Sequence, residues 1–133
     1  MSDITIGTEI PSLTLPPISR TTLALYAGAS GDHNPIHIDS DFAKKAGMFD
    51  VFAHGMLSMA YLGRMLTNWK PQSQLRKFSN RFATITQLQD VITCSGKVVE
   101  IFEESGEQRA RLEIVAAKQD GTQTLVGEAI IAL

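Results

Sequence analysis

The segment at residues 54–69, HGMLSMAYLGRMLTNW, constrains the fold more than any other part of this sequence. Apolar residues cover most of the circumference of the helix that it predicts, and Arg64 is its only charged residue. A helix that is apolar nearly all round is buried on most of its sides. Pro71 then ends it. We therefore expect one buried helix with the rest of the chain packed around it.

The second half of the chain shows the period of β-strands. Over residues 108–117, charged and polar residues alternate with apolar ones, which is typical of a strand with one solvent-exposed face. Strands are predicted at residues 76–86, 91–102, 108–117 and 122–133. Turn residues at 104–107 (ESGE) and 119–122 (QDGT) separate the last three, and Asp-Gly is a strong hairpin signal. We expect four consecutive strands in an antiparallel meander.

The first half is expected to be extended chain followed by two short helices. Ser19 or Thr21 caps a helix over LALYAGAS, and the DSD run at residues 39–41 caps a second helix that ends at Gly47. This order of elements predicts an α+β fold over residues 1–133, a single domain whose sheet curls around the buried helix. The two edges of that sheet need covering, so we expect an oligomer.

Composition excludes several classes of protein. With 133 residues and a net charge of −2, the chain has no basic field that would hold nucleic acid. Its single cysteine, Cys94, excludes an internal disulfide framework and a multi-thiolate metal site. The N-terminus lacks the basic and apolar regions of a signal peptide, and no apolar stretch is long enough to span a membrane. We therefore expect a cytoplasmic protein whose partners include neither nucleic acid nor a membrane.

The polar cluster GDHNPIH at residues 31–37 has three possible uses, of which metal binding is the first. Pro35 lies between His33 and His37 and argues against the helix that would align their rings. His54 could be a third ligand, but nothing in the sequence fixes its distance from the other two. We therefore expect no bound metal.

A nucleophile is the second possible use. None of the candidates Ser30, Ser58 and Cys94 lies in a Gly-x-Ser-x-Gly turn. Cys94 has the inward parity of its predicted strand, which is typical of a small core side chain rather than a reactive thiol. Nucleophilic catalysis is therefore not expected.

The third use is an acid/base pair. Asp32 and His37 share one loop that Pro35 stiffens, and a carboxyl with an imidazole suits proton transfer at two places on one substrate. Asn34 could orient one of them through its amide. Alternatively, Asp32 and Asn34 form an Asx-turn, which is the better interpretation for Asn34, while His33 points to solvent.

His54 and Gly55 stand at the N-terminus of the predicted buried helix. The first backbone N–H groups of a helix lack internal partners and carry the positive end of its dipole. Gly55 has no side chain to obstruct them, so a carbonyl oxygen placed there would be stabilised as an oxyanion. With the acid/base pair, this predicts proton transfer next to an activated carbonyl, including addition or loss of water across a conjugated double bond. Alternatively, Gly55 only packs against or caps the helix.

Two stretches of the sequence, YAGASGDHNPIHIDSDFAKKAG and FAHGMLSMAYLGRML, carry a family pattern. A small residue precedes Gly-Asp-x-Asn-Pro-x-His, and Ala-His-Gly-Met follows after a gap. This pattern resembles the MaoC-like dehydratases, the R-specific enoyl-CoA hydratase family, and RFATIT at residues 81–86 looks like that family's first strand after the helix. Relatives often carry a Pro-Gly-Asp turn next, whereas residues 87–90 are QLQD, so we expect this turn to be built differently.

The resemblance implies a hot-dog fold, in which a curved antiparallel sheet wraps a long central helix. It also implies a dimer and an acyl thioester substrate on coenzyme A or acyl carrier protein. It places Asp32 and His37 on the catalytic pair, Asn34 on their supporting amide, and Gly55 on the backbone N–H of the oxyanion hole. Ser58, one helical turn further on, is implied as a partner of Asp32.

The expected enzyme is a lyase of fatty acid metabolism that interconverts trans-2-enoyl and (R)-3-hydroxyacyl thioesters without a metal or redox cofactor. Met56, Met59 and Tyr61 could bind the acyl chain, or they could belong to the core. Two alternatives stay open: a thioesterase on the same fold, and a subunit of a heterodimeric dehydratase that needs a partner for activity. Without such a partner, we expect a homodimer or a higher homo-oligomer.

Overall fold

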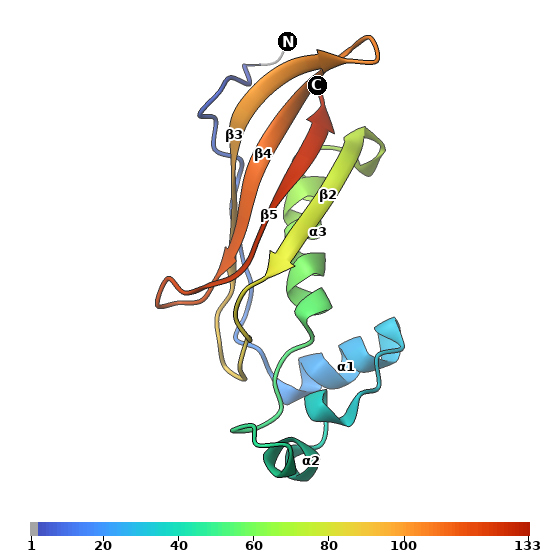
Figure 1. The fold of residues 1–133 in the computed structure, drawn as a ribbon, viewed down its shortest axis with the longest axis vertical. Coiled ribbons are helices and arrows are strands. Elements are labelled where there is room, and N and C mark those ends of the chain that lie inside the picture. Colours follow the sequence, from blue (N-terminus) through green and yellow to red (C-terminus); the bar gives the residue numbers. More distant parts are fainter. Residues whose placement is uncertain (1–2) are drawn as a thin grey trace.

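The computed structural model of this protein describes residues 3–133 (Figure 1). Along the chain, a very short strand precedes three helices, and four longer strands follow. The elements are β1 (Leu13–Thr14), α1 (Arg20–Ser30), the 3-10 helix η1 (Pro35–His37), α2 (Ser40–Lys45), α3 (Gly55–Trp69), the 3-10 helix η2 (Gln72–Gln74), β2 (Leu75–Phe82), β3 (Thr93–Glu104), β4 (Glu107–Ala117) and β5 (Gln123–Ala132). The long helix and the last three strands therefore lie within two residues of their predicted bounds, whereas β2 ends earlier, at Phe82.

The five strands form one antiparallel sheet in the order β1-β3-β4-β5-β2. The expected meander of four consecutive strands is therefore wrong, because β2 pairs with β5 at the far edge and only β3, β4 and β5 follow one another. The connection at residues 83–92 explains the difference. It pairs with the segment that enters α3, where the N–H of Ala53 donates to the carbonyl of Thr86 at 2.9 Å and Phe52 bridges to Gln87. A segment committed to that contact cannot turn back as a hairpin.

Helix α3 packs against the concave face of this curved sheet (Figure 1). Leu62, Met65 and Leu66 of α3 are at most 1% exposed and share one core cluster with sheet residues such as Leu112 and Ile131. Burial of such side chains stabilises the fold by roughly 1.5–3 kcal/mol each. Helix α3 is buried along one face, which carries Leu57, Ser58, Leu62, Met65 and Leu66, whereas Arg64, Thr67 and Asn68 of its second half are exposed. The predicted burial on most sides of the helix is therefore wrong.

Helices α1 and α2 lie beyond the N-terminal end of α3 (Figure 1). Ser19 caps α1 by accepting from the N–H of Thr22, and Asp39 caps α2 by accepting from Asp41 and Phe42, as predicted from the sequence. A second core cluster holds this end of the molecule together and consists of Ile18, Leu23, Ala43, Val51, Ala53 and Leu57. The loop between α1 and α2 is thereby held close to the start of α3.

The turn at residues 87–90 is organised by the carboxylate of Asp90. Its Oδ2 accepts from the N–H of Gln87 at 2.7 Å and lies 3.0 Å from Nζ of Lys118. Gln89 adopts a left-handed φ of 70° and donates its N–H to the carbonyl of Ile18. Within residues 3–133, no helix is long and apolar enough to cross a membrane.

Candidate active site

The loop after α1 is fixed by its own side chains. Gly31 ends the helix with a φ of 77°, a left-handed conformation that favours glycine. Asp32 Oδ1 then accepts from the N–H of Asn34 at 3.3 Å, and Asn34 Oδ1 accepts from the N–H of Ile36 at 3.1 Å. The amide of Asn34 thus caps η1, which agrees with the Asx-turn interpretation. Its support for the acid/base pair is indirect, through the turn that carries His37.

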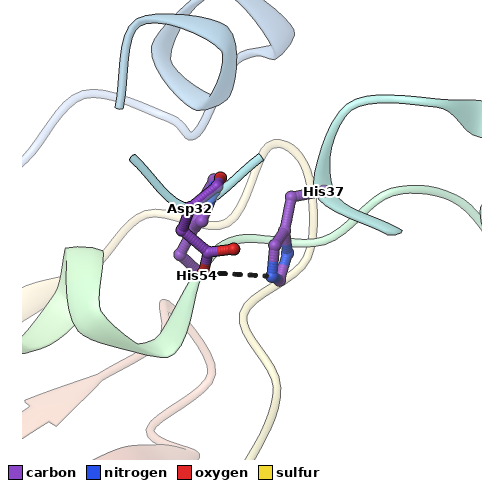
Figure 2. A group of neighbouring side chains, drawn as sticks. All are labelled: Asp32, His37 and His54. Atoms are coloured by element: carbon purple, nitrogen blue, oxygen red, sulfur yellow. Dashed lines mark hydrogen bonds and ion pairs between the residues drawn. The ribbon is translucent and has the colours of Figure 1, made fainter. Parts of the chain in front are cut away.

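His37 has a defined tautomer. Its Nδ1 lies 2.8 Å from the carbonyl oxygen of Phe52, and because a carbonyl only accepts, Nδ1 carries the hydrogen. In the neutral ring, Nε2 is left with a lone pair. That atom lies 4.0 Å from Oδ2 of Asp32. A dashed line marks this contact in Figure 2. The His37 side chain is 11% exposed and that of Asp32 is 49% exposed, so the imidazole is largely enclosed while the carboxylate is accessible to solvent.

A third side chain, His54, joins this pair in Figure 2. It is 1% exposed, and its Nε2 lies 3.1 Å from the backbone carbonyl of Asp32. Its ring stacks on that of His37 with centroids 4.0 Å apart, and it meets Tyr26 edge-on at 4.9 Å. Burial holds the pKa of His54 below the usual histidine value. The only role predicted for the His54 side chain from the sequence is that of a possible metal ligand, although its position next to Gly55 is a signal of its place in the site.

Asp32, His37 and His54 have possible ligand atoms within 4.8 Å of one another, an arrangement that a metal ion could use. Nε2 of His54 carries the hydrogen that it donates to the Asp32 carbonyl, so Nδ1, which is buried without a partner in the described part of the chain, is its only possible ligand atom. The expectation that no metal binds here therefore stays a prediction. His33, the other candidate ligand, is exposed in the loop, as expected.

Gly55 is the first residue of α3, with His54 as its N-cap. No hydrogen bond takes its backbone N–H within residues 3–133, so that group is available to an acceptor. A Cβ at position 55 would lie 2.9 Å from two ring atoms of Phe82, so the close approach of this ring requires a glycine. A cavity of about 220 Å³ borders this point and is lined mainly by apolar side chains. Its walls are Phe52, Ala53, Gly55, Phe82, Ala83, Thr84, Ile85, Thr86 and Leu125.

The cavity is not built from the methionines and tyrosine that the sequence suggested. Met56 is 52% exposed, while Met59 and Tyr61 are half-buried and pack against the core. Ser58 is buried and makes no hydrogen bond to Asp32 within residues 3–133. Roles for these four residues in catalysis or substrate binding stay predictions.

Cys94 is fully buried, and burial raises the pKa of its thiol to about 12. At neutral pH the thiolate, which is the nucleophilic form, is therefore scarcely populated. This agrees with the expectation that Cys94 is a core residue.

An ion-pair network fixes the three segments that carry the site. The guanidinium of Arg20 in α1 binds Asp50 with contacts of 2.6 and 3.3 Å, and Ser40 at the start of α2 donates to the same carboxylate at 2.8 Å. Asp50 precedes the segment that leads into α3. These hydrogen bonds, with the Arg20 bond foremost, hold the pKa of Asp50 well below its usual range.

Comparison with known proteins decides the family. Residues 5–122 match the sequence model of a family described as "MaoC like domain". The chain belongs to this family. Among solved structures, this chain is similar to the R-hydratase PhaJ1 from Pseudomonas aeruginosa in the unliganded form. The two are 28% identical with a TM-score of 0.86, and the match covers 98% of this chain and 83% of that one. This likeness confirms the hot-dog fold, with the sheet wrapped around α3.

Two relatives of this MaoC-like domain are longer than the region that matches it, the first by far and the second moderately. The fatty acid synthase subunit beta of Saccharomyces cerevisiae is 34% identical over 70 residues, which are 53% of this chain and 3% of that protein. The mitochondrial 3-hydroxyacyl-[acyl-carrier-protein] dehydratase FERN of Solanum lycopersicum is 28% identical over 108 residues, 81% of this chain and 66% of that protein. The matches thus cover less than two thirds of both relatives.

Proposed function

We propose that this MaoC-like domain adds water reversibly to a trans-2-enoyl thioester and so forms the (R)-3-hydroxyacyl thioester. The observation that carries the proposal is the facing pair of His37 Nε2 and Asp32 Oδ2, with the His37 tautomer fixed by Phe52. The names of two relatives, an R-hydratase and a 3-hydroxyacyl-[acyl-carrier-protein] dehydratase, support the same reaction class. The acyl group would be carried on coenzyme A or acyl carrier protein.

The spacing of the pair suits a water molecule as the reactant. At a separation of 4.0 Å, one water oxygen can lie about 2.8 Å from both Nε2 of His37 and Oδ2 of Asp32. His37 accepts a proton from this water as its oxygen bonds to C3 of the substrate. The electrons of the C2=C3 double bond move towards the thioester carbonyl to form an enolate. The protonated His37 then passes this proton to Asp32, which is transiently a carboxylic acid and protonates C2, so both side chains return to their starting states.

The backbone N–H of Gly55 is the proposed partner of the thioester oxygen. That oxygen gains negative charge in the enolate, and a helix N-terminus with an unpaired N–H favours such charge. The cavity beside Gly55 offers Phe82, Ile85 and Leu125 as apolar contacts for the acyl chain. Because a thioester already acidifies C2 and the reaction changes no net oxidation state, we propose that neither a metal nor a redox cofactor takes part.

We also propose that the chain works as a homodimer or a higher homo-oligomer. The sheet has β1, of only two residues, at one edge and β2 at the other, so a partner could cover either edge. A heterodimer with a separate chain remains the alternative, and a cytoplasmic location stays a prediction from the sequence.

A thioesterase is the second candidate function. Such an enzyme would need a carboxylate on the central helix, whereas α3 has the sequence GMLSMAYLGRMLTNW, without Asp or Glu. The test is to incubate the protein with a trans-2-enoyl-CoA and to follow the enoyl absorbance and the release of free thiol in parallel. We expect the absorbance to fall without thiol release. Thiol release with the enoyl group intact would instead identify a thioesterase.

The same preparation tests the oligomer. Size-exclusion chromatography of the protein expressed alone should give an active peak larger than a monomer of 14.5 kDa. An inactive monomer would contradict the homo-oligomer and favour the heterodimeric alternative.

A further inference from the structure

His54 contacts both members of the acid/base pair. Its Nε2 is 3.1 Å from the carbonyl oxygen of Asp32, and its ring is stacked on His37 with an interplanar angle of 28°. Tyr26 of α1 meets the ring edge-on. The side chain makes no capping hydrogen bond to α3, although His54 is the N-cap residue. Its contacts are therefore directed at the reacting groups and not at its own helix.

The hydrogen bonds define the charge of this ring. The carbonyl of Asp32 only accepts, so Nε2 of His54 carries the hydrogen. Nδ1 is buried without a hydrogen-bond partner in the part of the chain that the structure describes. The titratable groups that face the ring are His37 and Asp32 of the loop and Tyr26 of α1. A proton on Nδ1 would have no acceptor there and would place a second positive charge beside His37 whenever His37 is protonated.

We propose that His54 is a positioning residue that stays neutral and holds both proton-transfer groups, the Asp32 backbone by a hydrogen bond and the His37 ring by stacking. This inference rests on the proposed function, because it assigns His54 a part in the same reaction. The carbonyl of Phe52 selects the His37 tautomer, and the His54 ring fixes the plane in which Nε2 of His37 is presented. A neutral aromatic face also accommodates the His37 cation that forms in each turnover.

Histidine combines an aromatic face with an N–H donor at this position, and two substitutions each keep only one of these properties. Phenylalanine keeps an aromatic face for His37 but has no donor for the carbonyl of Asp32. Glutamine has an N–H donor but no aromatic face. The substitutions His54→Phe and His54→Gln therefore separate the two contacts.

The kinetic test measures kcat and KM for hydration of a trans-2-enoyl-CoA. We expect His54→Phe and His54→Gln each to lower kcat by roughly 10- to 100-fold, the cost of misplacing a reacting group, while KM changes by less than about twofold. The matched control is His33→Gln in the same loop, whose exposed side chain should be replaceable without loss of kcat. Thermal unfolding of each variant shows whether it is folded. A folded His54→Phe and His54→Gln pair with the parent kcat would overturn the proposal.

A second measurement needs no substrate. In protein labelled with ¹⁵N-histidine, nitrogen chemical shifts report which ring atom is protonated. At a pH of about 6.5, where an unperturbed histidine is half protonated, we expect Nε2 of His54 to carry hydrogen and Nδ1 to remain largely unprotonated. A His54 ring that is half protonated at this pH would contradict the proposal. An inactive parent enzyme would refute the proposed function instead, so the two failures are distinguishable.

Discussion

Nε2 of His37 lies 4.0 Å from Oδ2 of Asp32. The ring hydrogen of neutral His37 is on Nδ1, which donates it to the carbonyl of Phe52, so Nε2 is free to accept a proton. The base and the acid of the proposed reaction are thus separated by the space of one water molecule. Phe52 is distant in sequence from the loop that contains the pair. The direction of proton transfer therefore depends on how the segment before α3 docks against this loop.

Gly55→Ala tests the close contact at the start of α3. The new Cβ would lie 2.9 Å from the ring of Phe82, which is half-exposed and also lines the cavity, so we expect the ring to be displaced into the substrate site. The expected result is a fall in kcat/KM of about 100-fold, at the lower end of the effect of losing an oxyanion donor, measured by enoyl absorbance. The double variant Gly55→Ala with Phe82→Ala should recover part of the loss. No recovery would show that the ring is not the obstacle.

Gly127→Ala tests the packing of the edge strand. A Cβ at Gly127 in β5 would overlap the backbone carbonyl oxygen of Ser79 and the side chain of Asn80 in β2. Because backbone cannot move aside unless the strands part, we expect a loss of about 3 kcal/mol in the free energy of unfolding. Urea denaturation measures it. The control Gly28→Ala places a Cβ in open space within α1 and should gain about 0.5–1 kcal/mol. Equal stability of both variants would contradict this packing.

The Arg20–Asp50 network predicts a dependence of stability on pH. The pKa of Asp50 is depressed in the folded state, first by Arg20 and then by Ser40, so the folded state binds the Asp50 proton more weakly than the unfolded chain does. The resulting stabilisation is present above the unfolded pKa of about 3.9 and is lost as the pH falls through the lower folded value.

We therefore expect the stability advantage of the parent over Asp50→Asn to be constant at neutral pH and to shrink below a pH of about 4. Urea denaturation at a series of pH values measures the difference. Asp41→Asn, at an exposed position of α2, serves as the control. An advantage that grows on acidification would reverse the predicted sign.

The elements that the sequence predicts well are those encoded by neighbouring residues. The apolar residues of α3, the caps Ser19 and Asp39, and the Ser105-Gly106 turn between β3 and β4 each depend on contacts within a few positions. The partner of β2 depends on a contact between segments far apart in the chain. Periodicity shows that residues 75–82 form a strand, but it does not distinguish pairing with β3 from pairing with β5.

The residues of the site also differ in whether neighbouring residues or distant segments determine their contacts. Asp32 and His37 share one loop, so their proximity could be predicted locally, but Gly55 at the start of the helix and the family resemblance were needed to favour the pair over an Asx-turn. The role of His54 depends on a hydrogen bond across 22 positions to Asp32, which no local pattern encodes. Acyl-chain contacts were likewise predicted from α3, whereas the cavity walls come from the segment before α3, the end of β2, the connection after it and β5. Side chains that approach from separate segments become visible only once the chain is folded.

The central claim is that Asp32 and His37 together carry the protons of a hydration reaction. Hydration of crotonyl-CoA, followed by loss of enoyl absorbance, tests it most directly in Asp32→Asn and His37→Ala, with His33→Ala as the control from the same loop. The account predicts that each of the first two variants loses roughly 100-fold or more in kcat, remains folded by circular dichroism, and that His33→Ala keeps the parent rate. Hydration at the parent rate by either Asp32→Asn or His37→Ala would contradict it.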